Sequence, residues 1–308
     1  MKLKYCRSLL VIFCLAVSCL MPAATNQAPR LQTDITFVVA GKTGNFRQSA
    51  AGMVSALNYH FFAEIFIQNN GRIKQAALLT PDNLSEAIAF SDSGYALEMH
   101  GGRYPDEIEL EHHYPDGNYI FRYDTPSTGL LEQPIALVNS AAGNSRLPDA
   151  PHIILSQNGK PISPRLIQAD LPLTVTWSTF KQGNKDPLGI VNDLVFVIMG
   201  DCHGKRVSHS GRPFENTPYL DYVATEFIIP AEHLLPENAY QLSVEHAVVD
   251  TTITKGVPGL ATFATTTFLD IMTLGNATGE AACPEILRNF DAGQVDLRQP
   301  RLINLKNS

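Results

Sequence analysis

The chain has 308 residues, of which 44% are hydrophobic and 17% are charged, and its formal net charge is −7. This length is enough for about two domains, and the hydrophobic share excludes a chain that is disordered throughout. With 20 Pro and 21 Gly, the composition favours many short strands over long helices.

The first 24 residues have the layout of a secretory signal peptide. Three basic residues precede an apolar run at 9–21, and small residues follow at Ala23 and Ala24. The run has about 13 residues, whereas a membrane span needs ~20. We therefore expect an exported protein, either secreted, periplasmic or associated with the cell envelope. In an alternative interpretation, the segment ending at Cys19 resembles a bacterial lipobox, and a lipidated Cys19 would anchor the protein to a membrane.

Removal of the leader makes the protein more acidic. It takes away three basic residues and no acidic ones, so the net charge changes from −7 to −10. The remaining Lys and Arg residues form no cluster longer than a pair. Nucleic acid and anionic membrane surfaces are therefore poor partners for this chain.

Two of the five cysteines, Cys202 and Cys283, lie outside the leader. Two cysteines in an exported chain predict one disulfide. It would close a loop of about 80 residues and stabilise the fold by ~4 kcal/mol on the chain-entropy model. The alternative is two free thiols. No CxxC motif occurs, so the sequence gives no support for a redox site.

Residues 31–138 are predicted to form a divergent β-sandwich domain. The apolar segment HFFAEIFIQ at 60–68 predicts a strand, and the turn signal Asn69-Asn70-Gly71 predicts a hairpin with the segment at 72–80. The segment EIELE at 107–111 alternates strictly, which is typical of a further strand.

Glu107, Glu109 and Glu111 would line one face of that strand, which makes them weak candidates for a metal site. Alternate residues of a strand lie ~6.6–6.8 Å apart, whereas calcium ligands lie ~2.3–2.6 Å from the ion. Loops rich in Asp and Asn meet this requirement more easily. We therefore favour a charged edge strand that resists edge-to-edge pairing, and we expect neither a metal nor another cofactor.

A linker rich in small and turn-forming residues, 139–151, separates the first half from a second domain at 152–275, and 276–308 is predicted to be a C-terminal tail. About seven short strands separated by turns indicate a second β-sandwich. The predicted fold class is all-β, with two β-sandwich domains in tandem.

The second half resembles a fibronectin type III domain. The segments LPLTVTWSTF and LLPENAYQLSVEHA carry the resemblance, through Trp177, Leu235, Pro236 and Tyr240. The resemblance implies an immunoglobulin-like sandwich in which Trp177 is the core Trp and Tyr240 is the Tyr at the corner between the sheets. Both roles are structural. The whole chain is more loosely similar to uncharacterised exported bacterial proteins with two sandwiches.

An earlier segment, YPDGNYIFRYDT, repeats the pattern of the corner, with Pro115 and Tyr119 in place of Pro236 and Tyr240. Pro and the residues after it favour a tight turn. The Tyr ring then packs inward while its hydroxyl bonds to nearby backbone. The repeated motif therefore predicts a sandwich corner in each half and carries no chemistry.

The segment LVFVIM at 194–199 is apolar on both faces of its predicted strand. A sandwich strand normally has one face in contact with water. Something else must therefore cover the outer face. We expect packing between the two sandwiches, and the alternative is a second copy or another protein.

Candidate catalytic residues are few. Glu245, His246 and Asp250 lie on or just past one strand, and His246 has the parity of Tyr240 and so should face the core. No GxSxG, HExxH, P-loop or GxGxxG motif occurs. The sequence therefore predicts an exported, non-catalytic module that binds protein or glycan, with an undetermined oligomeric state.

Two alternatives stay open. The first is a glycan-active hydrolase or its accessory domain, for which we would expect carboxylates with raised pKa values that converge in a cleft. The second is a purely structural component of the cell envelope.

Overall fold

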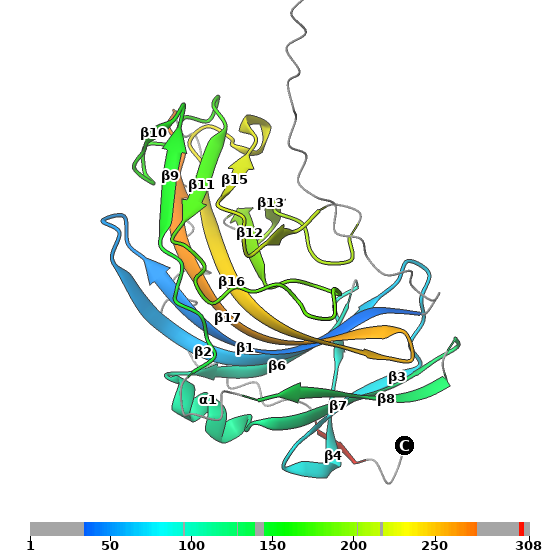
Figure 1. Ribbon diagram of the computed structural model, residues 1–308. Helices are drawn as coiled ribbons and strands as arrows, with labels where there is room; N and C mark the ends of the chain where they lie inside the picture. Colours follow the sequence, from blue (N-terminus) through cyan, green and yellow to red (C-terminus); the bar gives the residue numbers. More distant parts are fainter. Residues whose placement is uncertain are drawn as a thin grey trace, which may run out of the picture.

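The structure is a computed structural model that describes residues 34–94, 96–127, 129–138, 145–201, 203–215, 218–275 and 302–304. These residues form many β-strands, one α-helix and one short 3-10 helix at Ala231–His233 (Figure 1). The predicted all-β fold is confirmed. In this part of the chain, no helix is long and apolar enough to cross a membrane.

The strands form one large sheet and two smaller sheets. The large sheet has nine strands in the order β13-β12-β16-β17-β1-β2-β6-β5, and β14 pairs with β12. Its strands are β1 (Ile35–Gln48), β2 (Val54–Ile67), β5 (Ser91–Asp92), β6 (Ala96–Tyr104), β12 (Leu194–Asp201), β13 (Arg206–His209), β14 (Leu220–Asp221), β16 (Ala239–Thr254) and β17 (Val257–Met272). The central pair, β1 and β17, is parallel, from Val38 opposite Gly259 to Arg47 opposite Phe268.

The large sheet joins the two predicted domains. β1, β2 and β6 come from the first half of the chain, whereas β12, β16 and β17 come from the second half. β16 and β17 have 16 residues each, and β17 links the two halves because it pairs with β16 on one side and with β1 on the other. The boundary predicted at 139–151 stays a prediction, and residues 139–144 lie outside the described part of the chain.

The two smaller sheets pack against the same face of the large sheet, which we call the covered face. The five-stranded sheet has the order β18-β4-β3-β7-β8, and the four-stranded sheet has the order β10-β9-β11-β15. Figure 1 shows them at different ends of the molecule. Their strands are β3 (Gln75–Thr80), β4 (Asn83–Ala89), β7 (Gly117–Thr125), β8 (Gly129–Leu137), β9 (Ile153–Gln157), β10 (Lys160–Pro161), β11 (Leu173–Trp177), β15 (Glu226–Ile229) and β18 (Leu302–Asn304).

Each smaller sheet closes a hydrophobic core. Under the five-stranded sheet, Phe61 of β2 and Phe263 of β17 lie in one buried cluster with Phe121 of β7. Under the four-stranded sheet, Trp177 of β11 lies in a second cluster with Leu242 of β16. Alternate residues of each strand point to opposite faces, and residues of one parity of β17 contribute to both cores.

Both predicted corner tyrosines are buried, and their hydroxyls bond to backbone just before their own strands. The Tyr119 hydroxyl donates to the Pro115 carbonyl at 2.8 Å. The Tyr240 hydroxyl accepts the Leu235 N–H at 2.7 Å. Leu235 itself is 60% exposed, so its side chain contributes little to the core. The contribution of Leu235 to the corner is therefore its backbone N–H group.

The strand predicted at 107–111 is wrong, because this segment begins helix α1 (Glu107–His113). Asp106 caps the helix, and its Oδ1 accepts the Glu109 N–H at 2.9 Å. The cap and the acids of the first turn favour a helix, and five alternating residues are too few to outweigh them. Only Leu110 is buried, which gives the helix one anchor residue.

The three glutamates therefore do not line a strand face. On a helix, Glu107 and Glu111 lie one turn apart, and Glu109 points elsewhere. The Glu111 carboxylate lies 2.5 Å from the Lys42 ammonium. Among the described residues, no group of three or more His, Cys, Asp or Glu is placed to hold a metal ion.

The hairpin predicted from residues 60–68 and 72–80 is also wrong, because β2 pairs with β1 and β6, whereas β3 pairs with β4 and β7. Asp34 directs the chain out of the large sheet at this point. Its carbonyl accepts the Gln68 N–H at 3.0 Å, and its Oδ1 accepts the Arg72 N–H at 3.0 Å. The turn signal was real, but it connects two sheets.

Several sequence predictions fall outside the described residues. These are the signal peptide at 1–24, lipidation of Cys19 and the disulfide between Cys202 and Cys283. They stay predictions.

Candidate functional site: a groove on the concave face of the large sheet

The face of the large sheet opposite the two smaller sheets carries a mixture of apolar and charged side chains. In β16, Leu242 and Val244 belong to the core on the covered face. The alternate residues Ser243, Glu245 and Ala247 therefore point to the other side, where they line a common groove. The register of the sheet brings residues of β1, β2, β12 and β17 to the same side.

This face is concave. In the strand order, β2 and β12 are separated by β1, β17 and β16, which would be roughly 19 Å in a flat sheet at ~4.8 Å per strand. The guanidinium of Arg212 nevertheless lies 5.6 Å from the ring of Phe66 on β2 and 5.2 Å from the ring of Phe196 on β12. The sheet therefore curls, as long twisted strands tend to do.

The hollow on the concave face, which we call the sheet-face groove, has a volume of about 350 Å³. Phe37 and Phe66 stack in it with ring centroids 4.3 Å apart. The five phenylalanines that line the groove are Phe37, Phe62, Phe66, Phe196 and Phe268.

The outer side chains of the segment LVFVIM, which are Leu194, Phe196 and Ile198, line the same groove. Leu194 packs in one cluster with Phe37 and Phe66 of the first half. Residues of the first half therefore contact part of this apolar face, but they do so within one shared sheet and not between two separate sandwiches. The remaining part is the wall of the groove.

Two glutamates stand among these apolar groups. Burial raises the pKa of Glu64 on β2 to about 7; the positive charge of Arg212 lowers it, whereas Glu98 and Glu245 raise it further. Burial also raises the pKa of Glu245 on β16, whose Oε2 accepts the Thr266 hydroxyl at 2.7 Å. The groove therefore contains two carboxyl groups whose protonated form is favoured by their surroundings.

The part of the groove around His60 is polar. The Asn45 side-chain N–H donates to Asn58 Oδ1 at 2.8 Å, and the same nitrogen lies 3.1 Å from Nδ1 of His60. Burial lowers the pKa of His60 to about 3, with smaller contributions from the charges of Arg103 and His100. His60 is therefore neutral near pH 7 and offers one ring nitrogen as an acceptor and the other as a donor.

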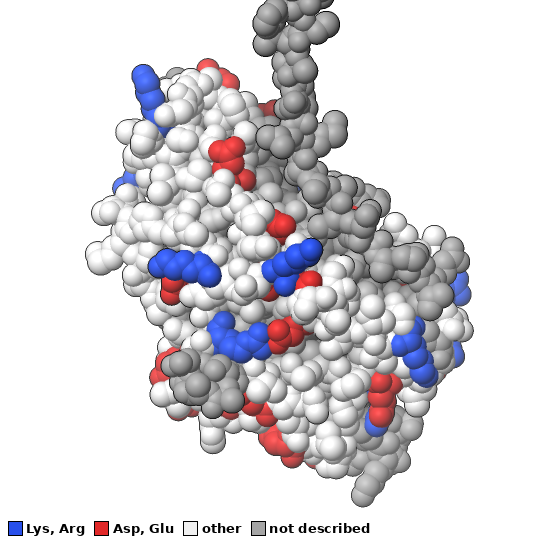
Figure 2. Space-filling view, viewed as in Figure 1, with Lys and Arg blue, Asp and Glu red and all other residues white. Residues whose placement is uncertain are grey.

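Charge on the rest of the visible surface is dispersed. Figure 2 shows Lys and Arg side chains scattered over one face, several of them beside Asp or Glu, without a continuous basic patch.

The structural residues predicted from the sequence do not line the groove. Trp177, Tyr119 and Tyr240 are buried on the side of the two cores, and Pro115 and Pro236 lie in the turns before the tyrosines. The sequence motifs thus locate the corners of the fold and leave the groove unmarked.

Of the three residues considered for catalysis, only Glu245 lines the groove. His246 is 1% exposed and stacks on Phe180 with ring centroids 4.5 Å apart, which confirms its predicted place in the core. Asp250 pairs with Arg146 at 2.5 Å. Glu64 and Arg212 were missed. The sequence contained one signal for Glu64, which is that it is an acidic residue within the segment HFFAEIFI, where apolar residues occupy both faces of the strand.

The raised pKa of Glu64 predicts a pH-dependent stability. The folded state binds a proton more tightly than the unfolded state, so the free energy of unfolding should fall as pH rises from about 4.5 to 7. The variant Glu64→Gln has no carboxyl group at this position and should not lose stability in this way. The free energy of unfolding of Glu64→Gln minus that of the parent should therefore increase between these pH values, and urea unfolding at pH 4.5 and pH 8 measures it.

Glu226→Gln is the matched control, because Glu226 is exposed on β15. A stability difference between Glu64→Gln and the parent that stays constant with pH would show that Glu64 titrates as an ordinary surface carboxyl.

Comparison with known proteins assigns the chain to no family. No protein-family model matches the chain, and no curated protein matches it.

Proposed function

We propose that this is an exported, non-catalytic β-sandwich protein that binds an apolar segment of another protein in the sheet-face groove. The observation that carries the proposal is the set of five phenylalanines on a concave face of the large sheet. Concave sites of about 300–1,000 Å³, largely apolar with a few placed polar groups, are typical of ligand-binding sites. The volume of the groove, about 350 Å³, lies within this range.

The lining favours a peptide over a glycan. Half of the lining residues are hydrophobic, and the aromatic ones are all phenylalanines, which offer no hydrogen bonds. A glycan would bring many hydroxyl groups against these walls, and each unpaired hydroxyl costs free energy. Apolar side chains of a protein segment lose no hydrogen bonds there, and the segment's backbone can bond to the polar end of the groove.

The fibronectin type III resemblance is part of the proposal. A sheet of β9, β11 and β15 faces β13, β12, β16 and β17, with Trp177 on the second strand. Two facing sheets of this kind are typical of immunoglobulin-like sandwiches. Export is supported by the layout of residues 1–24.

A second candidate function is glycan hydrolysis, and it is favoured by the two glutamates with raised pKa values in one groove. Glycosidases use one protonated and one ionised carboxyl group, so their surroundings drive the two pKa values apart. Here burial raises the pKa of both Glu64 and Glu245. We therefore place binding ahead of hydrolysis.

The test compares the mature protein with two variants on an array of random peptides and on a glycan array. Phe196→Asp places a charge in the groove, and Ile154→Asp places one on β9, where Ile154 is 48% exposed. The parent and Ile154→Asp should retain apolar peptides, whereas Phe196→Asp should weaken binding at least about tenfold, as loss of a central aromatic contact does. Near-UV circular dichroism checks that each variant is folded.

Other outcomes decide between the candidates. Glycans bound in place of peptides would overturn the choice of ligand. Cleavage of aryl glycosides that is lost in both Glu64→Gln and Glu245→Gln would replace binding with hydrolysis. If the parent retains neither peptides nor glycans, the remaining candidate is a purely structural component of the cell envelope.

A further inference from the structure

A second hollow, the arginine cavity, adjoins the sheet-face groove. Its volume is about 720 Å³, and its lining includes Arg206 of β13 and Glu215 of the loop after β13. The two hollows share Phe37, Phe66, Arg212 and Pro213. A ligand in the groove can therefore extend into the arginine cavity past Arg212.

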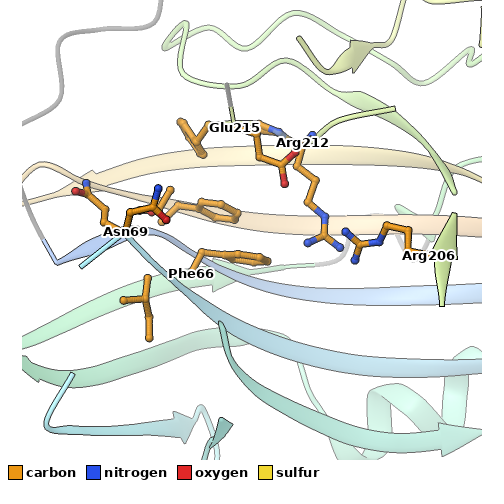
Figure 3. A pocket seen from close by; sticks show the side chains of 11 residues that line it. Phe66, Asn69, Arg206, Arg212 and Glu215 are labelled. Atoms are coloured by element: carbon orange, nitrogen blue, oxygen red, sulfur yellow. Dashed lines mark hydrogen bonds between the residues drawn. The ribbon is translucent and has the colours of Figure 1, made fainter. Parts of the chain in front are cut away.

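The two arginines converge at one end of this cavity. Both arginines line this cavity, and Figure 3 shows their guanidinium groups pointing toward one another. Within the described ranges, neither guanidinium forms an ion pair, and the Glu215 carboxylate bonds instead to the Arg212 backbone N–H at 3.1 Å. The cavity lining therefore has two positive charges and one negative charge.

Arg212 is held in place by aromatic rings. Its guanidinium lies over the rings of Phe66 and Phe196 at 5.6 Å and 5.2 Å. Rings that contact the flat face of a guanidinium leave the N–H groups at its edge available. Burial lowers the pKa of His209, the charges of both arginines lower it further, and the charge of Glu215 raises it. Two of the three charges that act on His209 are therefore positive.

Two like charges that point into one cavity repel each other, and an anion bound between them offsets the repulsion. A guanidinium donates in a fork that matches the two oxygens of a carboxylate. The apolar groove begins on the other side of Arg212. An anion that carries an apolar group would therefore place that group in the sheet-face groove.

We infer that Arg206 and Arg212 bind the C-terminal carboxylate of a peptide whose last side chains occupy the sheet-face groove. The inference rests on the proposed function and narrows it to partners with apolar C-terminal residues. Capture of a chain-terminal carboxylate is a known mode of peptide recognition.

The test is equilibrium dialysis of the mature protein with a mixture of N-acetylated tetrapeptides ending in Leu, Ile, Val or Phe. Each peptide is supplied as the free acid and as the amide, and mass spectrometry measures retention. The parent should retain acids at least about tenfold over amides, as a charge-assisted bidentate contact implies. This ratio should fall to about one in Arg206→Gln and in Arg212→Gln.

Two further variants sharpen the result. Arg212→Lys keeps the charge and loses the fork, so its ratio should lie between those of the parent and Arg212→Gln. Arg165→Gln is the matched control, because Arg165 is exposed and lies outside both hollows. It should keep the ratio of the parent.

The failures of the inference and of the proposed function are distinguishable. Equal retention of acids and amides, lost in Phe196→Asp, would overturn the carboxylate site and leave peptide binding in place. No retention of either form by the parent would overturn both. Binding of 8-anilinonaphthalene-1-sulfonate that is lost in Arg206→Gln, without retention of peptides, would overturn the peptide in favour of a small amphipathic anion.

Discussion

Asp186→Ala is expected to lower the free energy of unfolding by about 3–5 kcal/mol, because it removes a buried acceptor used by several donors. Asp186 is 6% exposed. Its carboxylate accepts the N–H groups of Leu188, Ile190 and Val191 at 3.0, 2.6 and 3.0 Å. It also accepts the Thr251 hydroxyl of β16 at 2.9 Å. Alanine would leave these donors without a partner.

The effect should extend to the concave face. Val191, whose N–H bonds to Asp186, is 1% exposed and packs in one cluster with Phe37 and Val39. Phe37 also lines the sheet-face groove. The carboxylate of Asp186 therefore fixes a loop that supports the groove, and its loss should weaken ligand binding as well as stability.

Equilibrium unfolding in urea measures the change, with Lys185→Ala as the control, because Lys185 is exposed and adjacent in sequence. Asp186→Asn keeps one acceptor oxygen and should cost less than Asp186→Ala. A loss for Asp186→Ala no larger than that for Lys185→Ala would show that the loop does not depend on this carboxylate.

The second large effect concerns the buried ammonium of Lys42 on β1. Lys42 is 1% exposed, and its Nζ lies 2.5 Å from Glu111 Oε2 and 3.2 Å from Asp116 Oδ1. These partners hold helix α1 and the turn after it against the large sheet. The double change Glu111→Gln with Asp116→Asn should lower the free energy of unfolding by about 3–5 kcal/mol, since it leaves a buried charge without a counter-charge.

Removal of the lysine should cost less. Lys42→Met keeps the apolar stem and removes the charge, and the carboxylates of Glu111 and Asp116 keep partial access to water, with side chains 27% and 37% exposed. We expect a loss of less than about 2 kcal/mol. Urea unfolding of both variants gives the comparison. The opposite order, with Lys42→Met the more damaging change, would contradict a buried charge that depends on its carboxylates.

The sequence was most informative where the physical cause is local. Turn residues before an inward tyrosine located both corners, because Pro115 and Tyr119 act within a few residues of each other. Parity placed His246 in the core, because side chains of a strand alternate regardless of its neighbours. Local reasoning failed at 107–111, where strict alternation was weighed without the helix cap at Asp106.

By itself, the sequence determined an all-β chain and an apolar strand at 194–199 whose outer face needed a cover. Only the tertiary structure decided that β1 pairs in parallel with β17, and that the resulting sheet curls until Arg212 lies over both Phe66 and Phe196. Glu64 and Glu245 meet in one groove for the same reason. Strand order and curvature depend on pairings between residues more than 200 positions apart, and the pattern along one strand contains no information about them.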